Sequence, residues 1–502
     1  MNRVIFVLVL LFLLADCFAG EDDFLRPVGK PPEAKAQRRQ GGEAFPPLPL
    51  PVTPLRRSEK KRPPSPGVLI GKVIWGSYLD YKWPNGVVVR VFDWNMVPAD
   101  CSKLLRLVKN YTKMEYKVQT LDLKFFSGDP AEVPVLLFSG GRALKFTPAE
   151  ILKLRRYLQA GGMIWFDSVV GSPYFYRSAL QAMRRILPDC PVKRLAPDNP
   201  VFRIIRPIVS AKVNNGKYIL PAFDGVYLGS RLAAVISPYG MGGGWDNTYP
   251  VLIKQAEYYQ RYPAIVLGVN LAAYAIGWSQ NGRLYAYRET AGQPAQNKNP
   301  DKVVFAQLRS SGIWNATAGA ESRFMRYLAK NVNINTGSEP VPVNAAKNRL
   351  ENYPFLYFTG IGHFKFSAEE LDKLRRYLDN GGFIFINNAL GMNEFNQSVI
   401  AAVKKLYPSA ELKNIPADDP LFAAAPFKFE KSGLSPEAAQ KFRGQSKPFL
   451  FGLKTAERYK IVYSPVDIAT GWLGVPSPGS VAYDQDTALR LGANVITYFL
   501  TH

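Results

Sequence analysis

Continuous apolar runs alternate along this chain with stretches of helical periodicity. Val133–Phe138 and Met163–Phe166 are uninterrupted apolar runs, which are typical of strands buried on both faces of a parallel sheet. Between them, Thr147–Glu150 has the pattern of a capping box with proline at the first helical position, and it predicts a helix that ends near Ala160. A strand, a helix and a second strand in this order predict a βαβ unit.

The rest of this first unit continues the alternation. We expect its first strand at Val87–Phe92, helices at Asp100–Lys109 and Tyr174–Leu187, a later strand at Leu232–Ile236 and a closing helix at Ile265–Ile276. Strands that alternate with amphipathic helices predict an α/β domain, in which helices cover both faces of the sheet.

The whole pattern occurs a second time. Leu154-Arg-Arg-Tyr-Leu158 recurs as Leu374-Arg-Arg-Tyr-Leu378, and Gly161-Gly162 recurs as Gly381-Gly382, a separation of 220 residues in both cases (374 − 154 and 381 − 161). Solenoid repeats are roughly 20–50 residues long, so this period indicates two copies of a whole domain. We therefore predict two tandem three-layer αβα domains with mostly parallel sheets. The second copy should repeat the elements at Val303–Gln307, Glu321–Lys330, Phe355–Phe358, Ser367–Glu370 (capping box), Phe383–Ile386, Glu394–Leu406, Ile461–Tyr463 and Asp486–Leu500.

The N-terminus predicts export. Residues 1–20 have a positive start, an apolar run from Val4 to Leu14 and a small-residue cleavage site before Gly20. The run is shorter than the roughly 20 residues of a comfortable membrane span. A cleaved signal peptide is therefore the first interpretation, and lipidation at Cys17 and an uncleaved anchor are the alternatives. We expect the chain in the periplasm or cell envelope.

Composition and charge separate a linker from the two domains. Residues 21–68 are rich in proline and basic residues, which predicts a disordered linker, and the domains follow at 69–285 and 300–502. The net charge of +23 favours acidic partners, which in an envelope are an acidic protein, polysaccharide, cell-wall polymer or lipid head groups. The alternative is that Lys and Arg only solvate helix faces. No nucleic-acid recognition motif is present, so nucleic acid is not an expected partner.

Both copies also carry motifs that resemble a known family. The second copy has Thr359-Gly-Ile-Gly-His-Phe364 after an apolar strand, then a Ser-x-x-Glu box, Leu-Arg-Arg-Tyr-Leu and Gly-Gly-Phe383, and the first copy matches less closely. This order resembles the domain-of-unknown-function family 4159 over about four fifths of the chain. The resemblance implies a class I glutamine-amidotransferase-like fold, related to ThuA-like proteins, and an exported or membrane setting, but it fixes no reaction.

Ligands of open α/β sheets bind beyond the carboxyl ends of the strands. The first loop at that edge is glycine-rich and precedes a helix, so its backbone N–H groups are candidates for binding an anion. Its candidate residues are Gly140 and Gly141 in the first copy and Thr359, Gly360 and Gly362 in the second. The alternative is that these glycines serve only a tight turn.

The second loop at that edge follows the next strand. It has Asp167-Ser168 in the first copy and Asn387-Asn388 in the second. The resemblance implies that the nucleophilic cysteine of the amidotransferase-like fold stands at this turn, and neither copy has a cysteine there. A serine nucleophile needs a histidine base, and the first copy contains no histidine. We expect no glutamine hydrolysis, and these residues imply no cofactor.

His363 is the strongest candidate for catalysis, and its counterpart in the first copy is Ala143. With Asn387, Asn388, Glu394 and Asp418 it would form a polar pocket. A carbohydrate-active enzyme or another hydrolase at this site requires that His363, Asn387 and Asp418 converge in an open pocket. The alternative is a histidine with a structural hydrogen bond. The spacing of these residues is not that of a metal-ligand set, so no metal site is expected.

The cysteines and two tryptophans have structural interpretations as well as functional ones. Cys101 and Cys190 are both replaced in the second copy, which favours a disulfide between them in an oxidising compartment; two buried thiols are the alternative. Trp245 and Trp472 each follow a glycine. We expect them to be buried, and the alternative is a flexible loop at Tyr239–Asp246 that stacks on a sugar.

Two functional hypotheses follow from the sequence. The first is a non-enzymatic binding or scaffolding protein of the cell envelope, in which at least the first copy is catalytically silent. The second is a hydrolase that uses only the second copy, around His363.

Overall fold

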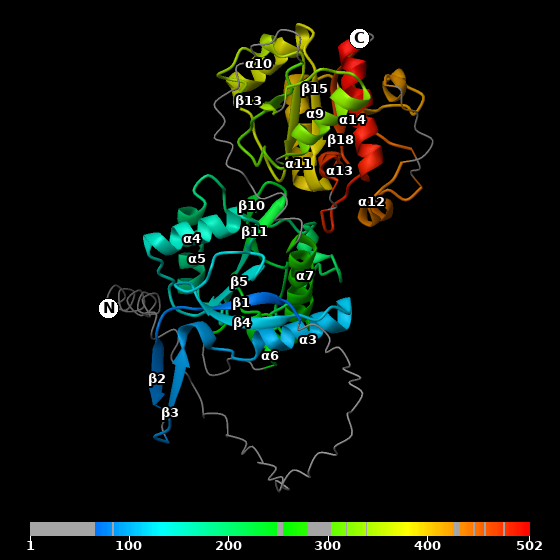
Figure 1. Ribbon diagram of the computed structural model, residues 1–502. Coiled ribbons are helices and arrows are strands. Elements are labelled where there is room, and N and C mark those ends of the chain that lie inside the picture. The colour runs from blue at the N-terminus through cyan, green and yellow to red at the C-terminus, as the bar shows by residue number, and fades with distance from the viewer. Residues whose placement is uncertain are drawn as a thin grey trace, which may run out of the picture.

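The computed structural model describes residues 66–502 apart from 83–84, 248–254, 280–302, 318, 338, 426, 428–431, 445–446, 456–457 and 475–476. The signal peptide expected at 1–20, and nearly all of the linker expected at 21–68, lie outside the described residues. Two α/β units follow one another along the chain, and each is built around its own seven-stranded sheet (Figure 1). The tandem α/β architecture predicted from the repeat is therefore confirmed.

The two sheets have the same topology. The order is β4-β1-β5-β6-β11-β10-β7 in the first and β13-β12-β14-β15-β18-β17-β16 in the second. In each sheet the first five strands are parallel, and the sixth pairs antiparallel with both of its neighbours. The strands are β1 Val68–Ile74, β4 Lys117–Asp122, β5 Val135–Gly140, β6 Met163–Ser168, β7 Lys193–Arg194, β10 Asp224–Leu228, β11 Arg231–Ser237, β12 Ala306–Leu308, β13 Val341–Val343, β14 Leu356–Gly360, β15 Ile384–Asn388, β16 Lys413–Asn414, β17 Phe451–Thr455 and β18 Arg458–Ser464.

Helices cover both faces of each sheet, as the alternating pattern predicts. In the first unit, one face is covered by α3 (Asp100–Thr112), α6 (Gly242–Asp246) and α7 (Arg261–Ser279), and the other by α4 (Pro148–Gln159) and α5 (Pro173–Ile186). In the second unit the corresponding helices are α9 Ala320–Asn331, α13 Ala469–Leu473 and α14 Gln485–Thr501, and then α10 Ala368–Asp379 and α11 Asn393–Leu406. Among the described helices only α7 is long and apolar enough to cross a membrane, and it packs in the domain core.

The repeated Leu-Arg-Arg-Tyr-Leu motif holds each helix to its neighbours. Arg155 donates from Nε to the carbonyl of Ile186 at the end of α5 (2.6 Å), and Arg375 donates in the same way to Leu406 at the end of α11 (2.9 Å). The ring of Tyr157 lies so close to Gly162 that a Cβ there would be 2.3 Å from it. The motif and the double glycine therefore recur because the packing needs them. Both predicted capping boxes are also confirmed.

The strand expected first in the chain lies outside the main sheet. Val88–Phe92 forms β3, which pairs antiparallel with β2 (Tyr78–Lys82) in a separate two-stranded hairpin. The first strand of the sheet is instead β1, whose apolar run is interrupted by Gly71 and Lys72. β1 is buried even so, because Lys72 forms an ion pair inside the fold, and an apolar run therefore does not mark this strand.

The expected disulfide is absent, because both cysteines are free. Cys101 lies on α3 in the core on one face of the first sheet, whereas Cys190 packs against the core on the opposite face. The sheet therefore separates the two thiols. Burial raises the pKa of Cys190 to about 11 and that of Cys101 well above its usual value. Their joint absence from the second copy reflects two independent packing sites.

The first unit packs against the carboxyl edge of the second sheet (Figure 1). Asp198 accepts a hydrogen bond from the backbone N–H of Asn393 (2.9 Å), and Arg203 donates from Nη2 to the carbonyl of Gly479 (2.9 Å). Five apolar residues of the second unit share the core of the first: Ala316, Ile361, Ala389, Leu390 and Met392. The first copy thus covers the edge at which the second copy would bind a ligand.

Candidate functional site at the carboxyl edges

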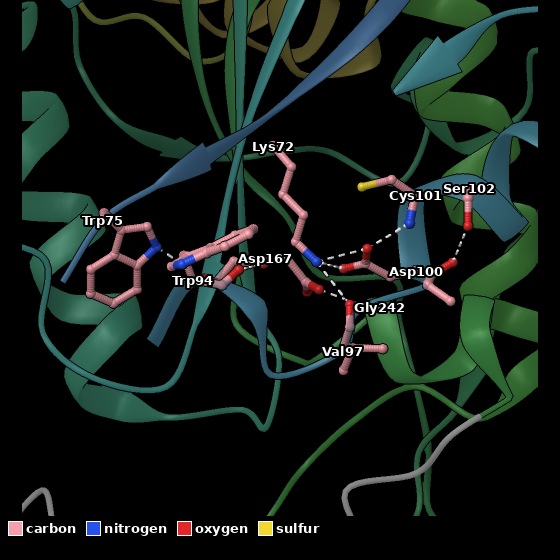
Figure 2. Close-up of polar contacts among 11 residues, drawn as sticks. Lys72, Trp75, Trp94, Val97, Asp100, Cys101, Ser102, Asp167 and Gly242 are labelled. Atoms are coloured by element: carbon pink, nitrogen blue, oxygen red, sulfur yellow. Dashed lines mark hydrogen bonds and ion pairs between the residues drawn. The ribbon is translucent and has the colours of Figure 1, made fainter. Parts of the chain in front are cut away.

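A buried ion pair lies at the carboxyl edge of the first sheet. Lys72 reaches from β1 to Asp100 at the start of α3, as Figure 2 shows. Its Nζ donates to both carboxylate oxygens of Asp100 (2.9 and 3.0 Å) and to the carbonyl of Val97 (2.8 Å). Lys72 is 3% exposed and Asp100 is fully buried. Burial of one charge without the other would be costly, so loss of either residue would destabilise the fold.

Asp167, predicted in the loop after the strand at Met163–Phe166, instead lies within β6, where it is beside this pair and fully buried. Its Oδ1 accepts from the N–H of Met241 (2.8 Å) and its Oδ2 from the N–H of Gly242 (2.9 Å). Burial raises the pKa of Asp167 to about 7, although these two hydrogen bonds act in the opposite direction. Both oxygens are therefore occupied by the protein's own backbone at the start of α6.

The glycine-rich loop of the first copy is covered by packed side chains. Gly140 and Gly141 are buried, and a Cβ on Gly140 would be 2.3 Å from the ring of Trp75 and 2.7 Å from the carbonyl of Asp93. Trp75 is held there because its Nε1 donates to the carbonyl of Ser139 (3.0 Å). The glycine serves a close approach of the protein to itself, which is the structural alternative to anion binding. Ser168 is likewise engaged, since it donates to the carbonyl of Ser172 (3.0 Å).

In the second copy, Asn387 occupies the place of Asp167. Its Oδ1 accepts from the N–H of Ile468 (2.8 Å), and its Nδ2 donates to Asp467 Oδ1 (3.0 Å) and Thr359 Oγ1 (3.1 Å). Asp467 stands five residues before Trp472, where the first copy has Gly240 five residues before Trp245 (472 − 467 and 245 − 240). The carboxylate has therefore moved from the strand end to the neighbouring loop.

Asp467 also holds the backbone of the turn after β15 in an unfavourable conformation. Its Oδ2 accepts from the N–H of Leu390 (2.9 Å), a residue with a left-handed φ of +62°. Such a conformation costs a non-glycine residue on the order of 1–3 kcal/mol and persists only where neighbouring contacts fix it. Asn388 closes the same turn, because it exchanges hydrogen bonds with the backbone of Met392 (3.0 and 3.1 Å).

The second copy has no buried cation in the position of Lys72. The strand register places Lys72 beside Leu137 and Gln307 beside Tyr357, which is the counterpart of Leu137. Instead, Glu321 of α9 is fully buried and accepts from Thr317 Oγ1 (3.0 Å), while its Oε2 has no hydrogen-bond partner among the residues that the structure describes. Burial raises the pKa of Glu321 to about 7 and also raises that of Asp467. Two buried acids therefore replace the lysine–aspartate pair.

The remaining glycines of the second copy serve packing and turn geometry. A Cβ on Gly360 would be 2.6 Å from the ring of Phe395, and Gly362 has a φ of +70°, which favours glycine. Thr359 is fully buried. The predicted ligand-binding loop is thus a tightly packed turn.

His363, Asn387 and Asp418 do not converge. The His363 side chain is 61% exposed, Asn387 is fully buried, and Asp418 lines a separate pocket of ≈ 230 Å³. Within the described residues, no hydrogen bond or ion pair joins any two of them, and no pocket is lined by two of them. The condition set for a hydrolase built from this trio is therefore not met.

Comparison with known families now adds to the geometry. The model of a domain of unknown function, DUF4159, matches residues 80–276 and again residues 304–500. The chain belongs to the DUF4159 family. A search of curated proteins finds no match to it. The two DUF4159 matches include every loop described above, and the first begins within the hairpin, so that it leaves out β1 and Lys72.

Glu394, which the sequence groups with His363, does lie beside it in the second DUF4159 copy, and Ser398 joins them. His363 Nδ1 lies 3.3 Å from Ser398 Oγ, and His363 Nε2 lies 3.8 Å from Glu394 Oε1. His363 and Ser398 line a pocket of ≈ 300 Å³ together with Lys365 and Lys405. Ser398 is the member that the sequence prediction missed, and its i, i+4 spacing from Glu394 on α11 is the signal for it.

The two tryptophans of the DUF4159 copies are structural, as expected. Trp245 and Trp472 are both buried, and their Nε1 groups donate to the carbonyls of Ala264 (2.8 Å) and Ala488 (2.9 Å). The segment expected as a flexible loop contains the short helix α6. Neither ring is placed to stack on a sugar.

Proposed function

We propose that this chain is an exported binding or scaffolding protein of the cell envelope that has no catalytic activity of its own. The observation that carries this proposal is that the carboxyl edges of both sheets are closed. Asp167 is engaged by backbone amides in the first copy, and the first copy covers the corresponding edge of the second. An enzyme of this architecture needs an open crevice at that edge, so the closed edges support a role in binding.

We further propose that both copies are variants of the class I glutamine-amidotransferase-like fold. Five parallel strands with a turn and a helix after β6 and after β15 support this assignment. Asp167 and Asn387 end the strands before that turn, and no cysteine lies there, so a cysteine–histidine hydrolysis has no nucleophile in either copy. Duplication then supplies two rigid modules instead of two active sites.

The partners we propose are an envelope protein or an anionic polymer or head group. The net charge of +23 and the apolar N-terminal run support this choice. The experiment is a pull-down from the envelope of the cell that makes the chain, with the full chain and with a chain that lacks residues 21–65. Saturable recovery of an envelope component supports the proposal. Recovery of no component by the full chain rules it out.

One observation favours a second candidate, a hydrolase in the second copy. Ser398, His363 and Glu394 lie in a row beside an open pocket, which is the order of a nucleophile, a base and an orienting acid. Ser398, however, donates to the carbonyl of Glu394 one turn earlier (3.0 Å), so its proton is not directed at the imidazole. Turnover of an ester or glycan that Ser398→Ala abolishes would favour this candidate.

A further inference from the structure

The β2–β3 hairpin projects away from the first sheet (Figure 1). Among the described residues its two strands form a sheet of their own, so both outer edges lack a neighbouring strand. Val88 is 57% exposed, Tyr78 is 48% exposed, and Val87, Val89 and Phe92 are exposed too. Exposed apolar patches of this kind mark interaction sites.

The base and the middle of the hairpin are fixed. At the base, Ser77 and Asp93 exchange two hydrogen bonds (2.8 and 3.0 Å). In the middle, Arg90 donates twice to Asp80 (2.7 and 2.8 Å) and lies 3.9 Å from the centre of the Tyr78 ring. An isolated two-stranded hairpin is only marginally stable in water, so these contacts are what hold it. The structure therefore presents the apolar tip instead of folding it onto the body.

The charge of the tip is positive. From Tyr81 to Phe92 the sequence contains Lys82 and Arg90 and no acidic residue. Arg90 is neutralised by Asp80, whereas Lys82 makes no ion pair with any described residue. An exposed apolar surface with an unpaired lysine beside it is the chemistry that binds an anionic membrane surface.

The same observations argue against the other obvious partner, an extended protein strand. Strand addition uses the length of an open edge, and here each strand has only five residues. The exposed valines instead gather at Val87–Val89, next to the turn and farthest from the fixed base. The net charge of +23 also favours an anionic surface.

We propose that the tip of the β2–β3 hairpin docks on an anionic lipid surface, with Val87–Val89 among the head groups and Lys82 on the lipid phosphates. This inference rests on the proposed envelope-binding function and names one partner for it. Bidentate pairing with Asp80 keeps Arg90 in the hairpin, so Lys82 provides the electrostatic contact.

The test is sedimentation of the chain from Gly20, its expected mature start, with lipid vesicles. Both sheets lie within this chain, so its folded body is complete. Vesicles contain either phosphatidylglycerol with phosphatidylcholine or phosphatidylcholine alone. We expect binding to the anionic vesicles that weakens as salt rises, that falls about tenfold in Val88→Asp and that falls severalfold in Lys82→Gln. The matched control is Val209→Asp, at a site 78% exposed outside the hairpin, which should bind like the wild type.

Several results would overturn the proposal. Equal binding to both kinds of vesicle, no binding to either, or unchanged binding by Val88→Asp and Lys82→Gln would each contradict it. If Val88→Asp instead lost an envelope protein while it kept vesicle binding, the hairpin would be a protein-docking strand. In all of these cases, recovery of an envelope component by the wild-type chain would still support the broader binding function. Failure of the lipid-docking proposal can therefore be told from failure of the proposed function.

Discussion

Asp198 of the first copy accepts a hydrogen bond from the backbone N–H of Asn393 in the second copy, at 2.9 Å. Asn393 is the first residue of α11, the helix that follows the turn after β15. The contact therefore brings the first copy to the point at which the second would hold a ligand. The repeat thus yields two copies with unequal surroundings, because one covers the other.

Loss of this contact should loosen the packing between the copies. Asp198→Ala removes the acceptor for the Asn393 amide, and we expect faster hydrogen exchange at residues 389–393 and a stability loss of up to about 1 kcal/mol. The matched control is Asp418→Ala, because Asp418 is the counterpart of Asp198 and lines a pocket within the second copy. Equal exchange at residues 389–393 in both variants would contradict this interface.

The buried pair of the first copy should be costly to break from one side. Lys72→Met leaves Asp100 buried without its cation, and we expect a loss of about 3–5 kcal/mol in the free energy of unfolding by urea. Lys109→Met is the control, since Lys109 is half exposed and its pair with Glu115 contributes less than about 1 kcal/mol. A double variant, Lys72→Met with Asp100→Leu, should recover much of the loss. Equal losses in the two single variants would rule out a structural role for Lys72.

Glu321 should make the protein less stable as pH rises. Burial raises its pKa from 4.5 to about 7, so between these values the folded state keeps a proton that the unfolded chain releases. The stabilisation is complete below about pH 4.5 and is lost as pH rises through 7, by on the order of 3 kcal/mol. Glu321→Gln should flatten the decline in unfolding free energy between pH 5 and pH 8, although Asp467 keeps part of it. An unchanged slope would show that Glu321 is ionised in the fold.

Reduction should leave the folded protein unaffected. Because the two cysteines lie on opposite faces of the sheet, dithiothreitol should not shift the unfolding midpoint. A thiol reagent should label Cys190 slowly and Cys101 only after unfolding, since burial suppresses both thiolates. Mass spectrometry of the labelled chain, with Cys190→Ser as the control, measures this. Destabilisation by the reductant would restore the disulfide interpretation.

Sequence periodicity predicted most of the fold because buried parallel strands have uninterrupted apolar runs. It missed β1, where Lys72 enters the strand to meet Asp100, and it assigned Val87–Phe92 to the sheet. It also missed the outer strands β4, β7, β10, β13, β16 and β17. Valine-rich strands have the same sequence pattern whether their side chains face a core or the solvent. The exposed hairpin therefore could not be told from a core strand without its neighbours.

The candidate site was harder to predict, because its geometry depends on contacts far apart in sequence. Asp167 and Asn387 were predicted in the loop after a buried strand, but they are among the last residues of β6 and β15 themselves. Asn387, however, donates a hydrogen bond to Asp467, and no sequence pattern predicts that contact. Glu394 was predicted beside His363, whereas Ser398, one helical turn later, was not predicted there.

The most direct test of the central claim compares binding and turnover in one experiment. Isolated envelope material is incubated with the wild-type chain and with the His363→Ala/Ser398→Ala double variant. Bound protein and released sugars, acids or amines are then measured. We predict that both chains bind the same component equally and release nothing. Product that the wild type releases and the folded double variant does not would contradict a non-catalytic binding protein.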